Sequence, residues 1–505
     1  MIWTGRLSEL SRNSTFARAL WLAVAVLISW LHLFMNTLRI THSDLLLDDA
    51  GTWGVARRSL ATLVTLPTEF HSQPPLYYYL LHFLLNISSS PWFLRGISWV
   101  FCWLLLLFVL FCWHELSLLS RLAFCLIFLF SNLAPYLSTC VRPYGLAALL
   151  TLVSSVTLLR LARQPTSRRA VVYAAWTIAM LYTMAFEVAV LLVHGLVVVA
   201  VIVGNLARRN RVETLRRSKI LALTMLAVGI AYTPYLLLAY HFQYRSNPTD
   251  TLAIVLRLGT YAGTLQEQFG FSTEINLILG TLAALAFVGE LCRKNWLVGL
   301  WPLLIVGPIA FVWYFISGRS PIGAQAKYMM PALLAVCALT ALGFEQVRPA
   351  IRRGFWPVLV VSLAVLVASK FPAFDRFMKS GPDLGPWALL HQELQHFPGK
   401  KLVFFDVGYE GQRPAYVTRE DPDVTYGTMA SRSWASGGDN HLTNEYVTHT
   451  ILRSSAECRC FFYYLEWPDG PYAEAFVPTL DALGYRRTSS LPSCWGHVVI
   501  GYCRP

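Results

Sequence analysis

Residues 92–113 read WFLRGISWVFCWLLLLFVLFCW and carry one charge, on Arg95. A helix of about 20 largely apolar residues can span the hydrocarbon core of a bilayer. Similar runs recur along the first 371 residues, so the sequence predicts eleven membrane-spanning helices. The predicted spans lie near 18–38, 92–113, 117–137, 142–163, 169–186, 187–206, 219–240, 274–292, 296–317, 328–347 and 353–371. The runs 169–186 and 187–206 are contiguous, so the count depends on reading them as two spans.

The composition is typical of a membrane protein. Hydrophobic residues make up 55% of the 505 residues and charged residues 14%, whereas a soluble domain carries roughly 25% charged residues. The mean hydropathy is +0.49. The chain also contains 17 Trp and 23 Tyr, residue types that favour membrane interfaces. On a soluble protein the net charge of +13 would suggest a nucleic-acid partner, but here the location of the charges matters more.

Basic residues indicate the orientation of the predicted spans. If the N-terminus lies in the cytoplasm, most Lys and Arg of the first 371 residues fall in cytoplasmic loops, as the positive-inside rule requires. These residues occur within 160–169, 208–219, 293–294 and 348–353. We interpret them as topology signals rather than as nucleic-acid or phosphate sites. No A-x-A cleavage pattern follows 1–38, which favours an uncleaved first span over a signal peptide.

The segment 372–505 differs from the preceding part. It contains no spanning run, and short strand-like stretches at 401–406, 460–465 and 496–502 alternate with Pro, Gly and Asp. We predict a small α/β domain here, after a membrane domain at 1–371. Eleven spans place this domain outside the cytoplasm, in a periplasmic type of compartment that permits disulfides. Its cysteines are Cys458, Cys460, Cys494 and Cys503, and their spacing does not reveal the pairing.

The first predicted outer loop, 39–91, carries two adjacent acids beside the membrane. Either Asp48 or Asp49 can cap a helix that runs to about Leu66. An apolar stripe on this helix predicts that one face lies in lipid. The stripe comprises Trp53, Ala56, Leu60, Leu63 and Val64. Pro74 and Pro75 open a second helix that is too short to span.

Four motifs, in order along the chain, resemble those of one family. The loop motif Asp48-Asp49-Ala50-Gly51-Thr52 resembles Asp-Glu-Ala-x-Tyr, and Gln73-Pro74-Pro75-Leu76-Tyr77-Tyr78 resembles His-Pro-Pro-Leu-Tyr-Tyr or Lys-Pro-Pro-Leu. Arg142-Pro143-Tyr144-Gly145-Leu146 resembles Arg-x-Tyr-x-Leu, and Lys327-Tyr328-Met329-Met330-Pro331 resembles Arg-Tyr-x-x-Pro. The family is the protein O-mannosyltransferase and aminoarabinose transferase (ArnT-like) group of the GT-C glycosyltransferase superfamily.

This resemblance implies an all-α polytopic GT-C fold with a catalytic outer loop and a small extracytoplasmic α/β domain. It implies transfer of a sugar from a polyprenyl-phosphate donor, of dolichyl or undecaprenyl type, to an extracytoplasmic glycan, lipid or protein. The expected location is a bacterial plasma membrane. The resemblance assigns catalysis to Asp48 and Asp49, and binding of the donor phosphate or substrate to Arg142, Tyr144, Lys327, Tyr328, Gln73 and Tyr77. No cofactor is certain. From its place in the loop, Asp49 can cap the helix, position the acceptor or hold a divalent metal.

The sequence departs from the family pattern in three places. Asp49 stands where the family has Glu, and Gln73 stands where it has His or Lys. The fourth span lacks the acidic residue that some members carry at its start. These departures bear on which sugar and which acceptor are used.

The residue types fit this chemistry independently of the resemblance. Transfer from a lipid phosphate needs a base that takes the acceptor proton, and Asp48 can supply it. Cations such as Arg142 and Lys327 stabilise charge on the departing phosphate. The sequence contains no P-loop and no Gly-rich dinucleotide turn, which fits a lipid-linked donor better than a nucleotide sugar.

Other interpretations remain open from the residues alone. The two acids can act only as helix caps, Arg57 and Arg58 as interface anchors, His82 as a structural residue, and Glu187 as the mark of an outer turn. A flippase or transporter of lipid-linked sugars is the main competing function, and a polysaccharide ligase or polymerase is another. Transporters usually carry intramembrane charges along an ion path, whereas the acids here cluster in an outer loop.

Overall fold

The computed structural model covers most of the predicted helices and the tail sheet. The described residues are 15–42, 47–64, 73–206, 211–243, 273–316, 328, 330–351, 390, 394–405, 423–428, 440–465, 473–492 and 498–504. The chain divides into two compact units. The first comprises Met1–Leu38, Val64–Tyr77 and Arg95–Lys379, and the second comprises Arg39–Leu63, Tyr78–Leu94 and Ser380–Pro505.

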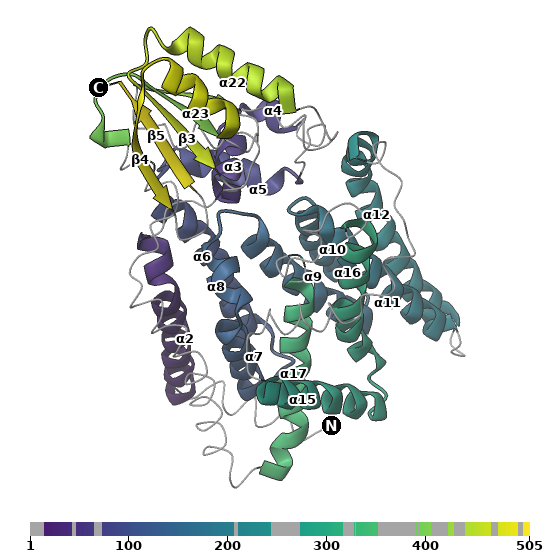
Figure 1. Ribbon diagram of the computed structural model, residues 1–505. Helices are drawn as coiled ribbons and strands as arrows, with labels where there is room; N and C mark the ends of the chain where they lie inside the picture. Colours follow the sequence, from purple (N-terminus) through teal and green to yellow (C-terminus); the bar gives the residue numbers. More distant parts are fainter. Residues whose placement is uncertain are drawn as a thin grey trace. The chain divides into compact units, whose positions relative to one another are not determined.

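The first unit is built from apolar helices (Figure 1). They are α2 (Thr15–His42), α6 (Pro91–Leu107), α7 (Leu118–Phe130), α8 (Leu133–Thr139), α9 (Tyr144–Arg163), α10 (Ser167–Leu181), α11 (Val188–Leu206), α12 (Arg211–Gln243), α15 (Thr273–Cys292), α16 (Leu300–Ile316) and α17 (Met330–Ile351). A π-helical turn, η2 (Phe108–Cys112), extends α6. Two 3₁₀ turns, η3 (Ala185–Glu187) and η4 (Trp296–Gly299), precede α11 and α16. Within the described residues, five helices are long and apolar enough to cross a membrane, or six if α7 and α8 form one span.

Helices coincide with the predicted spans from 18–38 to 328–347, whereas 353–371 lies outside the described residues. The contiguous runs 169–186 and 187–206 form two separate helices, α10 and α11. We call the corner between them, residues 182–187, the α10–α11 corner. It contains η3, and it contacts Gln73 and Tyr328 of the candidate site.

The third predicted span, 117–137, is not a single helix. Its two halves, α7 and α8, are bent by 78°. Ser131 has an extended backbone at the end of α7, and its hydroxyl oxygen accepts a hydrogen bond from the amide of Ala134 at 3.2 Å. The side chain thereby caps the next helix. Apolarity alone does not reveal such a break, because Ser131 also fits within an apolar helix.

Contacts at the helix ends support the predicted alternation of helix direction. Arg160, near the end of α9, donates to both carboxylate oxygens of Glu115 at 2.7 and 2.8 Å. Glu345, near the end of α17, accepts a hydrogen bond from the amide of Ser117 at the start of α7. The starts of α9 and α17 meet instead through Tyr144 and Tyr328, whose ring centroids are 6.2 Å apart. Therefore α9 and α17 run in the same direction, as the sequence predicts.

Close packing at the start of α9 requires Gly145. A Cβ atom here would lie 2.9 Å from the carbonyl oxygen of Leu137 and 3.1 Å from that of Ser98. Both neighbours are backbone atoms, so they cannot rotate away as a side chain can. We expect Gly145→Ala to cost about 1–3 kcal/mol of stability, measured as a lower thermal unfolding midpoint in detergent. Gly204→Ala is the matched control, because a Cβ there meets nothing within 4 Å; equal losses in both variants would contradict this explanation.

The tail in the second unit forms a five-stranded sheet with two helices. The strands are β1 (Lys401–Phe405), β2 (Val424–Thr428), β3 (Cys460–Leu465), β4 (Arg486–Pro492) and β5 (Val498–Cys503), in the order β2-β1-β3-β5-β4. β1 is parallel to β2 and β3, and β5 is antiparallel to β3 and β4. Three of these strands match the stretches predicted from the sequence, so the chain has the small sheet expected near its C-terminal end.

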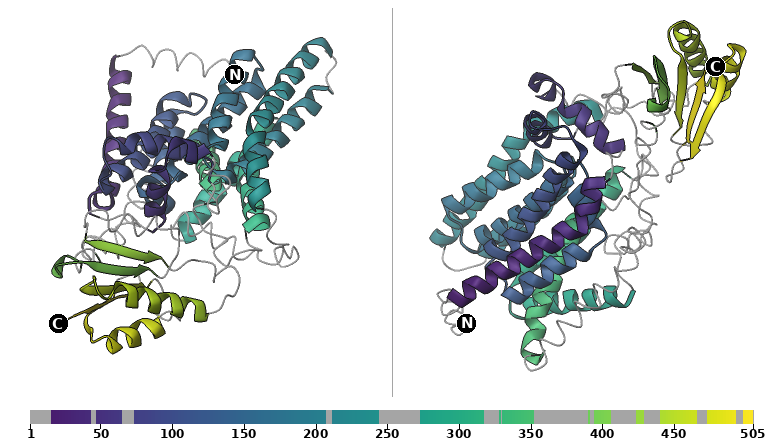
Figure 2. Two further views of the ribbon diagram at one scale, coloured as in Figure 1. Left: turned by 90° about the horizontal axis from the view of Figure 1, so that it is seen from above. Right: turned by 90° about the vertical axis from the view of Figure 1, so that its left-hand side faces the viewer.

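Both tail helices, α22 (Asn440–Ser454) and α23 (Ala473–Ala482), cover the same face of this sheet (Figure 2). Alternate strand residues point to that face, so Phe404, Phe461 and Tyr463 share one core. Val447, Ile451, Phe476 and Leu480 complete it from the helices. The tail therefore has an apolar core of its own.

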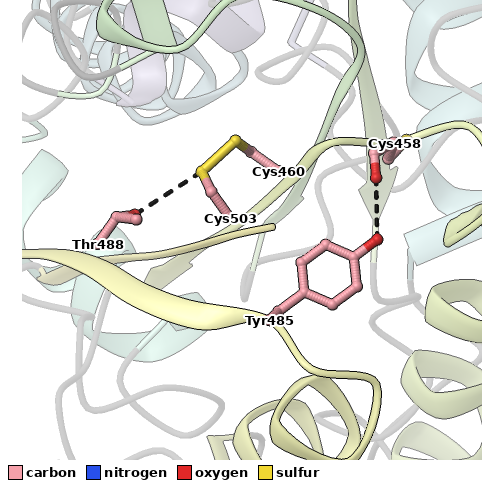
Figure 3. The surroundings of a disulfide bond; sticks show 5 residues. All are labelled: Cys458, Cys460, Tyr485, Thr488 and Cys503. Carbon is pink, nitrogen blue, oxygen red and sulfur yellow. Dashed lines mark hydrogen bonds between the residues drawn. A yellow bond between two sulfur atoms is a disulfide. The ribbon is translucent and has the colours of Figure 1, made fainter. Parts of the chain in front are cut away.

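Strand register decides which cysteines pair. Cys460 and Cys503 lie directly opposite each other in the antiparallel pair of β3 and β5. They form a disulfide with a Cα–Cα distance of 4.1 Å (Figure 3). Cys458 keeps a free thiol, and burial raises its pKa, which disfavours the reactive thiolate. Cys494 lies outside the described residues.

We expect Cys460→Ser to destabilise the tail by about 2–4 kcal/mol, because the disulfide closes a long loop, with a sequence separation of 43 between the two cysteines. The readout is faster proteolytic cleavage of the tail in the intact membrane protein. Cys458→Ser is the control, since its thiol is free. Equal sensitivity of the two variants to protease would contradict the pairing.

Candidate active site

The two acids of the outer loop lie in the first turn of a helix. α3 (Leu47–Ala56) begins before Asp48, so the prediction that one of the acids caps the helix from outside is replaced by a position within it. Asp49 is buried, with 1% of its surface exposed. Acidic side chains in a first turn are favoured by the partial positive charge of the helix N-terminus. Asp49 is thereby held at a defined place in the first turn of α3.

The loop helix is shorter than predicted and is followed by a separate one. α3 ends at Ala56, and α4 (Leu60–Val64) begins after a break at 57–59. The hydroxyl of Ser59 accepts a hydrogen bond from the amide of Thr62 at 3.2 Å, which caps α4. The predicted helix to Leu66 is therefore divided in two.

The apolar stripe of the loop does not face lipid as a continuous surface. Trp53, Ala56 and Leu63 are buried within the protein, whereas Leu60 is exposed. The guanidinium of Arg57 lies over the Trp53 ring, 4.6 Å from its centroid. The prediction of one lipid-facing stripe is thus corrected, because most of its members pack inward.

A second loop helix, α5 (Leu76–Leu85), follows the Pro-Pro pair as predicted. Nδ1 of His82 is 2.8 Å from the carbonyl oxygen of Ala56. This hydrogen bond joins α5 to the end of α3, so His82 has the structural role that the sequence left open. Tyr77, on the first turn of α5, is fully buried.

The Gln73-Pro74-Pro75-Leu76 segment docks on the α10–α11 corner. The side-chain oxygen of Gln73 accepts a hydrogen bond from the amide of Ala185 at 3.3 Å. The amide of Leu76 donates to the carbonyl oxygen of Tyr182 at 2.9 Å. Helix N-termini leave backbone donors unpaired, and the two prolines supply none, so Leu76 offers the first free donor. The motif is therefore anchored by the backbone of the corner.

Tyr144 and Tyr328, from two distant motifs, are brought together. Tyr144 is the first residue of α9, and its ring makes an edge contact with that of Tyr328 at 6.2 Å. Phe186 of the corner also packs against Tyr328, with ring centroids 4.6 Å apart. Arg142 is half-buried two residues before Tyr144, and Lys327 lies outside the described residues.

The sequence-predicted residues thus fall into two groups. Gln73, Tyr144 and Tyr328 gather around the α10–α11 corner in the first unit. Asp48 and Asp49 belong to the second unit. A shared cavity for Asp48 with Arg142 and the Lys327 motif therefore stays a prediction.

Glu187 is a candidate site residue that the four motifs do not include. This residue is fully buried at the end of η3, and one carboxylate oxygen accepts a hydrogen bond from Thr151 of α9 at 2.8 Å. The available signal was its isolation, because the sequence has no other Asp or Glu between 170 and 203. An ionisable residue within an apolar membrane segment is a functional candidate by default.

No metal cluster is found in the described part of the chain: it holds no group of three or more His, Cys, Asp or Glu that could bind a metal ion. The described candidate residues offer carboxyl groups, tyrosine hydroxyls, the side-chain amide of Gln73 and the guanidinium of Arg142. Such groups can bind hydroxyl groups and, through the guanidinium, an anion.

No family model matches the sequence, and no curated protein matches it. The fold, however, matches the crystal structure of ArnT from Cupriavidus metallidurans in the apo state, with a TM-score of 0.54, 13% identity, and coverage of 96% of this chain and 98% of ArnT. The structure of the same protein bound to undecaprenyl phosphate matches with a TM-score of 0.56 and 12% identity, over 97% of this chain and 98% of that one.

The chain has an ArnT-like fold. The likeness runs through both units, since it covers nearly the whole of each chain. With several helices able to cross a membrane, the protein is a multi-pass membrane protein. The fold expected from the four motifs is confirmed at this level.

Proposed function

We propose that this protein is an integral-membrane glycosyltransferase that moves a sugar from a polyprenyl-phosphate donor to an extracytoplasmic glycan, lipid or protein. The observation that carries this proposal is the ArnT-like fold over nearly the whole chain, which includes a likeness to ArnT bound to undecaprenyl phosphate. The four motifs support it, because each matches the family in order along the sequence.

In the proposed reaction, an acceptor hydroxyl oxygen attacks the anomeric carbon of the donor sugar. The bond between that carbon and the phosphate oxygen breaks, and the polyprenyl phosphate leaves with the bonding electrons. Asp48 takes the hydroxyl proton, while Arg142 and Lys327 stabilise the charge on the phosphate. Tyr144 and Tyr328, whose rings contact each other, are proposed to line the donor site, and Asp49 is proposed to position the acceptor or a divalent metal.

The test is a transfer assay with the purified protein in lipid vesicles. Labelled undecaprenyl and dolichyl phosphates carrying different sugars are supplied with candidate acceptors, and the products are identified by mass spectrometry. A new glycosidic bond together with free lipid phosphate supports the proposal. Movement of labelled lipid across the bilayer with no new bond would favour a flippase, and growth of a polymer would favour a polymerase.

The proposed topology has eleven spans, with the N-terminus inside and residues 372–505 outside the cytoplasm. The basic clusters of the predicted inner loops support it, as does the Cys460–Cys503 disulfide, since disulfides persist in oxidising compartments. We expect a tag placed after Pro505 to react with a membrane-impermeant probe in intact cells. A tag that reacts only after the cells are permeabilised would contradict the topology.

A further inference from the structure

The α10–α11 corner contains a carboxylate with an unused oxygen. Thr151 donates a hydrogen bond to Oε2 of Glu187 at 2.8 Å. The other oxygen, Oε1, is buried and has no hydrogen-bond partner in the described structure. Buried polar atoms are nearly always paired, and an unpaired one costs about 1–3 kcal/mol. We therefore expect this oxygen to accept a hydrogen bond from a group that the described side chains do not provide.

A second buried oxygen lies in the same region. Tyr232 of α12 is buried, and its hydroxyl also has no hydrogen-bond partner among the described residues. The hydroxyl of Tyr182, in the corner itself, donates to the carbonyl oxygen of Ala231 at 2.8 Å, which holds this part of α12 against the corner. The rings of Tyr182 and Tyr235 pack against Tyr232, with centroids 5.9 and 5.3 Å away. Two unsatisfied oxygens thus share an environment lined by aromatic rings.

The ligand chemistry follows from these groups. A carboxylate oxygen accepts a hydrogen bond, while a phenolic hydroxyl donates or accepts one. A hydroxyl group on a ligand can satisfy both at once, which a hydrocarbon chain cannot do. Aromatic faces suit the apolar C–H surface of a sugar ring.

The location matches a sugar held next to the lipid phosphate. The corner contacts Tyr328 through Phe186 and binds Gln73 through Ala185. Both Tyr328 and Gln73 belong to the motifs assigned to the donor. Glu187 is thus adjacent in sequence to one donor-motif contact and two residues from the other.

We propose that Glu187 and Tyr232 form a subsite that binds a hydroxyl group of the donor sugar and so contributes to sugar specificity. This inference rests on the proposed function, because it takes the ligand to be a lipid-linked sugar. Its structural alternative is an ordered water that bridges the two oxygens.

The experiment compares binding of bare undecaprenyl phosphate with binding of undecaprenyl phosphates that carry mannose, glucose, galactose or arabinose. Affinities are measured by native mass spectrometry of the full-length protein in detergent. The ratio of the affinity for a sugar-bearing lipid to the affinity for the bare lipid isolates the contribution of the sugar to binding. We expect Glu187→Gln to reduce this ratio about ten-fold for the preferred sugar, because a hydrogen bond to a charged group is lost. Tyr232→Phe should reduce it about three- to ten-fold, and both variants should bind the bare lipid as the wild type does.

Tyr173→Phe is the matched control. It also removes a buried hydroxyl from the bundle, but one that already pairs with His194, at 3.2 Å. It should leave the ratio unchanged. The double variant Glu187→Gln with Tyr232→Phe tests whether one ligand hydroxyl contacts both side chains. If it does, the fold-reduction of the affinity ratio in the double variant should be smaller than the product of the two single fold-reductions.

Three outcomes would contradict the proposed subsite. One is an equal loss of affinity for bare and sugar-bearing lipids in the Glu187 and Tyr232 variants, which indicates a structural role. Another is an unchanged ratio in both variants. The last is a wild-type protein that binds no sugar-bearing lipid better than the bare one. If the ratio falls as expected but the wild type forms no glycosidic bond, the subsite stands and the proposed transferase activity fails.

Discussion

Asp48→Asn is expected to slow sugar transfer by about 10²–10⁴-fold, the usual cost of removing a general base. Asparagine keeps the size of the side chain but cannot accept the acceptor proton. Asp48 lies in the first turn of α3, where asparagine is also tolerated, so the variant should accumulate normally in the membrane. The measurement is the initial rate of transfer from labelled polyprenyl-phosphate sugar at saturating acceptor.

Asp49→Asn is the matched comparison, since the two acids are adjacent and only one is proposed as the base. Asp49 is buried within the protein, so its replacement should mainly affect folding and acceptor binding. Loss of a helix-terminal carboxylate interaction costs about 1 kcal/mol or less of stability, which is far below the effect on catalysis. A normal rate for Asp48→Asn with a lost rate for Asp49→Asn would reverse the two roles. Activity in both variants would remove the outer-loop carboxylates from the mechanism.

Lys327→Gln is expected to lower kcat/KM for the lipid donor by roughly 10- to 100-fold. A hydrogen bond to a charged group contributes about 1.5–3 kcal/mol, and the loss should affect both donor binding and stabilisation of the leaving phosphate. Lys327 itself lies outside the described residues, but its neighbour Tyr328 packs on Tyr144 and Phe186. The readout is the dependence of the initial rate on donor concentration.

Lys294→Gln provides the control for this charge. Lys294 lies in the turn between α15 and η4, in a loop predicted to face the cytoplasm. Its removal lowers the net charge by the same amount, but the donor dependence should not change. If the two variants lose donor affinity equally, the effect belongs to the overall positive charge and not to a phosphate contact at Lys327.

Local chemistry explains why much of the fold is readable in the sequence. Apolar length decides whether a helix can lie in a bilayer, so the runs from 18–38 to 328–347 appear as helices. β1, β3 and β5 likewise follow short β-rich stretches. The four motifs mark the ends of such elements, and Tyr144 and Tyr328 indeed meet. Errors arose where a short-range feature intervened, such as the Ser131 cap that bends α7 from α8.

The contacts of the candidate site are harder to predict from the sequence, because they join residues that are far apart in the chain. Glu187 and Thr151 are 36 residues apart, and Gln73 and Ala185 are 112 apart. Their pairing depends on which helices pack together and at what depth. The loop stripe was misassigned for the same reason: apolar spacing indicates that Trp53 and Leu63 avoid water, but lipid and protein interior are equally apolar.

Residue type and spacing are enough to predict the membrane class, the succession of apolar helices, the strands of the tail and the motifs that indicate a lipid-linked sugar donor. Each of these follows from residue type and spacing within about 20 residues, where hydrophobicity and turn chemistry act locally. The bond between Cys460 and Cys503 cannot be predicted from spacing, because it depends on the register of β3 against β5 in the folded sheet. The same packing places Glu187 beside Thr151, and Tyr232 against Tyr182 of the α10–α11 corner, because the arrangement of the helices determines which buried polar groups find partners.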